Sequence, residues 1–385
     1  MNSSRQMSRK PSTLEAYRSV LRLIHGMKAA EGTRLPTQTE LMEELKICAV
    51  TLDTAMKWLI EDEVIVRKRR VGTFVLRPYP EHPRRAIWRV GIVMPPITHS
   101  YFGAVLTHFL HKHLDAFGIS DRTYLLSPHA VHGSEVLERR PSDFTGLQDD
   151  IDEGLLDGIV TSTRLRQAGI PVCGVASWER AEFGVLIDYA AFLKDSVKAL
   201  QGKGCRNLLY VLPHNPLDWC YFSQQSALGT VEAELRTLGI GFRSEICPIS
   251  TGSGFPLERR FLEKILALSP SERPDGFIVQ DDITGQALAS MLATTNYRPF
   301  FAVQTNRQMP ISFAIPSLPF SIDLDQLASC AAELLMAKLL APTSEGKIVF
   351  ARPLPMQEVS PALIGWESFR STPISSLQSN VSPNL

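Results

Sequence analysis

The side chains best suited to bind a polyanion lie together near the amino end of this chain of 385 residues. Lys46, Thr51, Lys57, Arg69 and Arg70 fall in one short stretch, and each can donate a hydrogen bond to a phosphate oxygen. Such grouping is typical of a surface that follows a nucleic-acid backbone. The alternative is an ordinary solvated basic face.

Two short helices and a hairpin would position these side chains. Pro36 ends any helix before it, and Thr37 followed three residues later by Glu40 forms a capping box that begins a helix. A second helix is predicted to bury one face and expose another: Val50, Thr54, Met56, Trp58 and Leu59 inside, Thr51, Asp53 and Lys57 outside.

A basic hairpin and a further helix complete this unit. The hairpin runs through Val64–Val66, turns at RKRRVG and returns as Thr73–Val75. Gly72 suits a turn that requires a positive φ angle. A preceding amphipathic helix over Leu14–Ala30 would cover the apolar back of the unit.

The stretch resembles the DNA-binding head of the GntR family of bacterial transcription regulators. The matching motifs are the LPT-x-x-EL opening, the EEL before the turn, the region of Thr51 and the closing VGTFV. The resemblance implies a winged helix-turn-helix, whose second helix enters the major groove of DNA. A small structural module without DNA contact is the alternative.

The chain departs from the family where the family commonly carries arginines, at Thr39, Ala49 and Asp53. An arginine can grip guanine with two hydrogen bonds, worth about 1–3 kcal/mol of discrimination. Threonine and alanine can still meet a thymine methyl or a phosphate, but Asp53 would repel phosphate. The DNA-contacting residues that we expect are Thr37, Gln38, Thr39, Lys46, Ala49, Thr51, Asp53, Lys57, Arg69, Arg70 and Gly72.

Composition predicts more than one domain. Residues 1–77 carry a net charge of +5 and the remainder −5, which suits a nucleic-acid reader joined to a separate sensor. No segment approaches the roughly 18 apolar residues of a membrane span, and the N-terminus is too polar for a signal peptide. Six scattered cysteines without metal-finger spacing indicate reduced thiols. We therefore expect a cytoplasmic protein without contact to a membrane.

The predicted domain order begins with a disordered N-terminus and ends with a disordered tail. The full division is 1–10 disordered, 11–76 winged-helix DNA-binding domain, 77–88 a proline-stiffened solvated linker, 89–370 a two-lobed effector-binding and dimerisation domain, and 371–385 disordered.

From Arg89 onward, short apolar strands alternate with helical stretches. The strands are RVGIVM, DGIV, IPVCGV, NLLYVL, DGFIVQ and FFAVQT, and helices are expected at 100–118, 219–238, 283–293 and 324–340. Strands at this rhythm form parallel sheets with right-handed crossovers. Ligands of such sheets bind at the carboxyl ends of the strands. The fold class predicted for the whole chain is therefore α/β.

This second region resembles the two-lobed sensor shared by LacI-type repressors and periplasmic sugar-binding proteins. The matching stretches are RVGIVMPPITHSYF, LLDGIV, AGIPVCGV, CRNLLYVL, RPDGFIVQDDITGQAL and IDLDQLASCAAELL. The resemblance implies an effector cleft lined by Ser100, Tyr101, Trp178, Asp188, Trp219, Asp282 and Asn306. For the three aromatic residues, packing at the hinge or rim is the alternative. Gln224 and Gln225 stand where sugar-binding relatives usually carry an arginine, so the class of effector stays open.

Enzyme motifs are missing from the sequence: it holds no GxxxxGK, GxSxG or HExxH. His108 and His111 would share a helix face, but a solvated face is favoured over a metal site. Asp149 and Asp150 are interpreted as surface residues. We expect no enzyme activity, no cofactor and no metal.

The sequence thus predicts a DNA-binding transcriptional regulator, with repression the favoured output. As a homodimer, it would bind operator DNA with an affinity set by a small effector, a sugar being one candidate. The alternatives are a small-molecule-binding protein whose head has altered or lost DNA specificity, and a sugar-active α/β enzyme.

Overall fold

A computed structural model describes residues 12–94, 102–127, 138–177, 182–212, 222–248, 254–309 and 311–356. The chain divides into two compact units. Unit 1 holds residues 1–97, 101–187 and 324–351, and unit 2 holds residues 98–100, 188–323 and 352–385. The two segments expected to be disordered, 1–10 and 371–385, lie outside the described residues.

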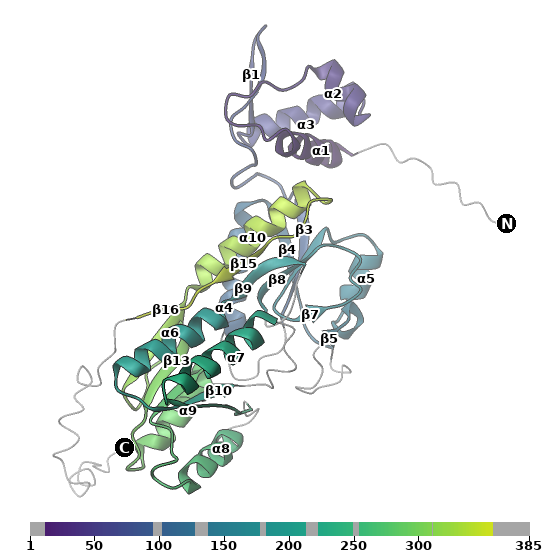
Figure 1. Cartoon of the computed structure of the whole chain (residues 1–385). Coiled ribbons are helices and arrows are strands. Elements are labelled where there is room, and N and C mark those ends of the chain that lie inside the picture. The colour runs from purple at the N-terminus through teal and green to yellow at the C-terminus, as the bar shows by residue number, and fades with distance from the viewer. Residues whose placement is uncertain are drawn as a thin grey trace, which may run out of the picture. The chain divides into compact units, whose positions relative to one another are not determined.

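The amino-terminal part of unit 1 is a three-helix head with a two-stranded wing (Figure 1). Its elements are α1 (Thr13–Gly26), α2 (Gln38–Leu45), α3 (Ala49–Glu61), β1 (Ile65–Lys68) and β2 (Gly72–Val75). The strands pair antiparallel, with Lys68 opposite Gly72. The predicted capping box is confirmed: the Thr37 N–H donates to Glu40 Oε2 at 2.7 Å, and the Glu40 N–H donates to Thr37 Oγ1 at 3.4 Å.

The core of the head corrects one prediction about α3. Leu52, Ala55, Met56 and Leu59 of α3 are buried, whereas Val50, predicted to be buried, is 79% exposed. Val50 is only the second residue of the helix, one position after Ala49, and its side chain projects away from the core. Helix α1 is also shorter than predicted, because Lys28 takes a left-handed φ of 49° just after it.

The rest of unit 1 is a six-stranded parallel sheet in the order β15-β9-β8-β6-β3-β4. Its strands are β3 (Trp88–Val93), β4 (Ile119–Tyr124), β6 (Gly158–Thr161), β8 (Val172–Ser177), β9 (Phe183–Ile187) and β15 (Ile348–Ala351). Helices α4 (Phe102–Ala116) and α10 (Leu324–Leu340) pack against each other, and α10 also covers β6, β8 and β9. Helix α5 (Leu147–Asp152) contributes Leu147 to a separate cluster with Tyr124 and Ile159.

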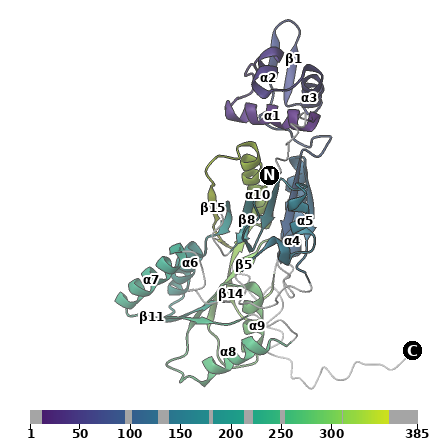
Figure 2. The same cartoon turned by 90° about the vertical axis from the view of Figure 1, so that its right-hand side faces the viewer.

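Unit 2 contains a second six-stranded sheet, in the order β11-β10-β12-β13-β14-β16. Its strands are β10 (Asn207–Leu212), β11 (Gly241–Ile246), β12 (Gly276–Val279), β13 (Phe300–Asn306), β14 (Ser317–Ile322) and β16 (Leu354–Pro355). All pairings are parallel except β14 with β16. The helices are α6 (Tyr189–Gly202), α7 (Phe222–Thr237), α8 (Pro256–Ala267) and α9 (Asp282–Ala293), with α8 beside α9 (Figure 2).

The segment between head and sheet differs from the solvated linker expected at 77–88. Although several of its residues are exposed, Ile87 and Trp88 are buried. The His82 N–H donates to the Ala116 carbonyl at 2.8 Å, and the Tyr79 ring meets the Phe117 ring edge-on. The segment is therefore anchored to α4 and to the turn that follows it.

Helix α1 of the head is clamped to the sheet of unit 1 by Arg18. Its guanidinium donates to both carboxylate oxygens of Asp157, at 2.8 and 3.2 Å, and to the Ile87 carbonyl at 2.7 Å. It also lies over the Trp88 ring, 4.5 Å from the centroid. Asp157 accepts in addition from the Arg89 N–H at 2.9 Å. One carboxylate thus joins α1, the start of β3 and the turn before β6.

A glycine pair in this sheet gives a stability prediction. Gly184 of β9 lies opposite Gly174 of β8 and has a φ of 152°. A Cβ at Gly184 would come within 2.1 Å of the Gly174 carbonyl oxygen, which is backbone and cannot move aside cheaply. We expect Gly184→Ala to lower the free energy of unfolding by about 2 kcal/mol or more, measured by urea unfolding.

The control for this prediction is Gly202→Ala at the end of α6, where an added Cβ meets nothing within 4 Å. We expect it to change the free energy of unfolding by less than about 0.5 kcal/mol. Equal effects of the two substitutions would contradict the close approach of β8 and β9.

Candidate functional site

The outward stripe of α3, which consists of Val50, Asp53, Thr54 and Lys57, carries an ion pair that joins the helix to the wing. Asp53 Oδ2 lies 2.9 Å from Lys57 Nζ, and its Oδ1 lies 3.8 Å from Arg67 Nη1 on β1. The hydrogen bond from Lys57 holds the pKa of the Asp53 carboxyl below its usual value. The negative charge that should repel phosphate is therefore offset by two neighbouring cations, and Asp53 links α3 to β1.

Two of the cations expected to contact DNA occupy backbone positions that favour glycine. Lys46, in the turn between α2 and α3, has a φ of 53°, and Arg70, at the tip of the wing, has a φ of 62°. Both side chains are exposed. Gly72 has the positive φ that its place in the hairpin predicted, 140°, and an added Cβ would lie 2.9 Å from Arg34 Nε.

The other expected DNA contacts all lie on the same head. Thr37, Gln38 and Thr39 are exposed at the start of α2, and the Thr37 hydroxyl is engaged with Glu40 at 2.8 Å. Ala49 begins α3 and is exposed, whereas Thr51 is half-buried. Thr51 Oγ1 lies 3.1 Å from Cys48 Sγ.

In unit 2, two of the expected effector residues meet at the carboxyl ends of neighbouring strands. Asp282 begins α9, shortly after β12, and Asn306 ends β13; both are buried. Asn306 Nδ2 donates to Asp282 Oδ2 at 2.9 Å. Burial, and next the carboxylate of Asp281, raise the pKa of Asp282 to about 7.

The pair itself leaves one buried polar atom without a hydrogen-bond partner: among the residues that the structure describes, no group donates to Asn306 Oδ1. An unpaired buried polar atom costs about 1–3 kcal/mol, so a polar ligand that donates to this oxygen would add a hydrogen bond.

Of the other residues expected to bind the effector, the structure describes only Asp188. The Asp188 carboxylate accepts from the Ala191 N–H at 2.9 Å and caps α6. Ser100, Tyr101, Trp178 and Trp219 lie outside the described residues.

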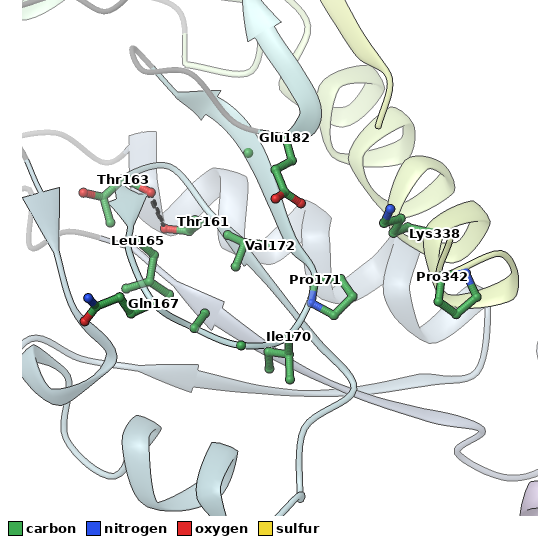
Figure 3. A pocket seen from close by; sticks show the side chains of 13 residues that line it. Thr161, Thr163, Leu165, Gln167, Ile170, Pro171, Val172, Glu182, Lys338 and Pro342 are labelled. Carbon is green, nitrogen blue, oxygen red and sulfur yellow. Dashed lines mark hydrogen bonds between the residues drawn. The ribbon is translucent and has the colours of Figure 1, made fainter. Parts of the chain in front are cut away.

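A pocket of about 500 Å³ opens within unit 1 (Figure 3). The loop between β6 and β8 forms much of its wall, with Glu182 and Lys338 among the other lining residues. Thr161 Oγ1 accepts from the Thr163 N–H at 3.1 Å. No motif in the sequence pointed to this loop, because its residues are brought to the sheet only by the fold.

The histidines and acidic pairs noted in the sequence have local partners. His111 pairs with Asp121, and the His108 ring meets the Phe109 ring edge-on. On the same helix, His113 Nε2 lies 2.6 Å from Asp325 Oδ1. Asp150, interpreted as a surface residue, is half-buried and accepts from Arg122 Nη1 at 2.7 Å. The described part of the chain contains no group of three His, Cys, Asp or Glu residues that could hold a metal ion. Nor does it contain a helix long and apolar enough to cross a membrane.

Comparison with known proteins identifies the head and the fold of the remainder. Residues 12–75 match the family described as bacterial regulatory proteins, gntR family. No curated protein matches the chain. The head is therefore a GntR-type helix-turn-helix domain, as its motifs predicted.

Solved structures of transcription regulators share the two-sheet architecture. The Cra transcriptional dual regulator from Pseudomonas putida, in complex with fructose 1-phosphate, is 16% identical with a TM-score of 0.53, covering 71% of this chain and 99% of that one. A LacI family regulator from Arthrobacter sp. FB24, in complex with lactose, is 15% identical with a TM-score of 0.52, covering 70% and 97%. A periplasmic binding ribose operon repressor protein from Lactobacillus acidophilus is 15% identical with a TM-score of 0.52, covering 70% of this chain and 97% of that one. At these identities the likeness shows the fold.

The raised pKa of Asp282 predicts a pH dependence of stability. Between its ordinary pKa of 3.8 and its folded value of about 7, the folded chain binds more protons than the unfolded chain, so stability falls as pH rises. We expect the free energy of unfolding of the full-length chain to drop by about 2–3 kcal/mol from pH 5 to pH 8, measured by urea unfolding.

Asp282→Asn should flatten that slope, because the amide does not titrate. The control is Asp195→Asn on α6, a partly exposed carboxylate 2.7 Å from Arg352, which should leave the slope unchanged. An unaltered slope in Asp282→Asn would show that Asp282 is ionised throughout.

Proposed function

We propose that this chain is an effector-controlled transcriptional regulator in which the GntR-type head binds operator DNA and the two-lobed region binds a small molecule. The observation that carries the proposal is the junction of a helix-turn-helix head with a LacI-type fold in one chain. In such an arrangement the sensor region is covalently joined to the DNA-binding head and also packs against it.

The proposed DNA interface consists of the α3 stripe, the turn before it and the wing. Lys46, Arg69 and Arg70 are exposed cations suited to phosphate contacts, and α3 is the helix that enters the major groove. The full set proposed to contact DNA is Thr37, Gln38, Thr39, Lys46, Ala49, Thr51, Asp53, Lys57, Arg69, Arg70 and Gly72.

The proposed effector is a polyhydroxylated molecule, a sugar or sugar phosphate. The buried Asp282–Asn306 pair, with Asn306 Oδ1 left unpartnered, suits hydroxyl groups, which both donate and accept. Two of the structural relatives were solved with fructose 1-phosphate and with lactose. The proposed contacts are Ser100, Tyr101, Trp178, Asp188, Trp219, Asp282 and Asn306.

The coupling would run through the Arg18 clamp. Ligand binding that shifts the sheet of unit 1 moves Asp157 and Trp88, and these hold α1 of the head directly. We propose that the chain acts as a cytoplasmic homodimer, with two heads on operator half-sites about 34–36 Å apart. Effector and operator would then influence each other by about 1–3 kcal/mol.

The proposal is tested by sequencing genomic DNA fragments retained by the purified full-length chain, with and without a panel of sugars and sugar phosphates. A recurrent sequence whose recovery changes with one compound is the expected result. Retention of no DNA at low salt would support instead a small-molecule-binding protein whose head has lost DNA contact.

The wing gives a second prediction. Arg69→Ala with Arg70→Ala should weaken DNA binding and reduce the slope of log affinity against log salt by about 2, because two phosphate contacts and their released counterions are lost. The measurement is a titration of operator DNA by fluorescence anisotropy at several salt concentrations.

The matched control removes Arg259 and Arg260, two adjacent exposed arginines of α8 in unit 2. This change keeps the net charge equal to that of the wing variant. If both double variants gave the natural salt slope, the wing would not belong to the interface.

A further inference from the structure

An apolar side chain occupies the part of α3 that is best placed to reach base edges. Val50 is the second residue of the helix and is 79% exposed. In helix-turn-helix domains the first residues of the second helix contact base edges in the major groove. Ala49, immediately before it, is also exposed and apolar.

The core of the head does not explain a valine at this position. Leu52, Ala55, Met56 and Leu59 supply the buried face of α3. A β-branched residue on an exposed turn of a helix is a weaker helix former than alanine or lysine. Neither packing nor local helix stability therefore favours Val50.

The polar groups on the same stripe are already engaged within the head. The Thr54 hydroxyl donates to the Val50 carbonyl at 3.0 Å, so its methyl group is left for other contacts. Lys57 and Asp53 form an ion pair at 2.9 Å. Along α3, all of which the structure describes, no arginine is available to grip guanine.

We infer that α3 recognises thymine methyl groups through Val50, with Ala49 and the Thr54 methyl beside it. This inference rests on the proposed function, and adds the bases that the operator must present. In the major groove only thymine carries a C5-methyl group, and apolar side chains are its usual partners. The operator half-sites should therefore carry thymines at the positions facing the start of α3.

Deoxyuridine scanning tests the inference, because it removes the methyl group and keeps every hydrogen-bonding group of the base. A DNA duplex retained by the natural full-length chain is resynthesised with each thymine singly replaced by deoxyuridine. We expect one or two positions in each half-site where affinity falls about fourfold, the loss for one buried methyl group. Other thymines should be insensitive.

A protein variant assigns the effect to Val50. Val50→Ala should bind the natural duplex about fourfold more weakly or worse, and should lose the sensitivity to deoxyuridine at those positions. The control is Ile60→Ala, a 37% exposed apolar residue near the other end of α3, which should keep both the affinity and the sensitivity.

Two results would overturn the inference while leaving the proposed function intact. One is salt-dependent DNA binding in which no single deoxyuridine replacement lowers the affinity. The other is a Val50→Ala variant that keeps the full sensitivity. If the natural chain retains no DNA, the proposed function fails first, and the inference fails with it.

Discussion

The clamp between Arg18 and Asp157 is the interaction on which the behaviour of the whole chain depends. A planar guanidinium that donates two parallel hydrogen bonds fixes orientation as well as distance, and here it also meets the Ile87 carbonyl and the Trp88 ring. Arg22 adds a second cation over the same ring, 5.1 Å from its centroid, and donates to the Leu339 carbonyl at 3.3 Å. The head is thereby tied to the start of β3, to the turn before β6 and to the end of α10, so a movement in the sheet can be transmitted to the DNA-binding head.

The head itself combines conventional architecture with an altered reading surface. Its capping box, turn and wing follow from local sequence rules. The exposed stripe of α3, however, carries Val50 and the Asp53–Lys57 ion pair instead of arginine side chains that could contact bases. Affinity would then come mainly from Lys46 and the wing arginines, and base selection from shape and methyl contacts. In unit 2, Asn306 is bonded to the buried Asp282 and leaves its own Oδ1 without a partner at the end of β13, which favours a ligand with hydroxyl groups.

Local patterns predicted more of the fold than of the site. The apolar runs at β3, β6, β10, β12 and β13 were visible in the sequence, whereas β4 (ISDRTY) and β11 (GFRSEI) consist largely of polar residues, which conceal them. Val50 was predicted to be buried because it fits an apolar series, but the starting residue of α3 decides which way it points. The role of Asp53 depends on Arg67 from another element, and the raised pKa of Asp282 depends on tertiary burial. Neither the role of Asp53 nor the raised pKa of Asp282 can be derived from the spacing of residues in the sequence.

The most direct measurement compares operator affinity with and without the effector, in the natural chain and in Arg18→Ala. In the natural chain the effector should change the affinity at least about fivefold, the lower end of usual allosteric coupling. In Arg18→Ala the ratio should approach one, while both DNA binding and effector binding persist. An unchanged ratio in the variant would show that the signal reaches the head by a path other than this clamp.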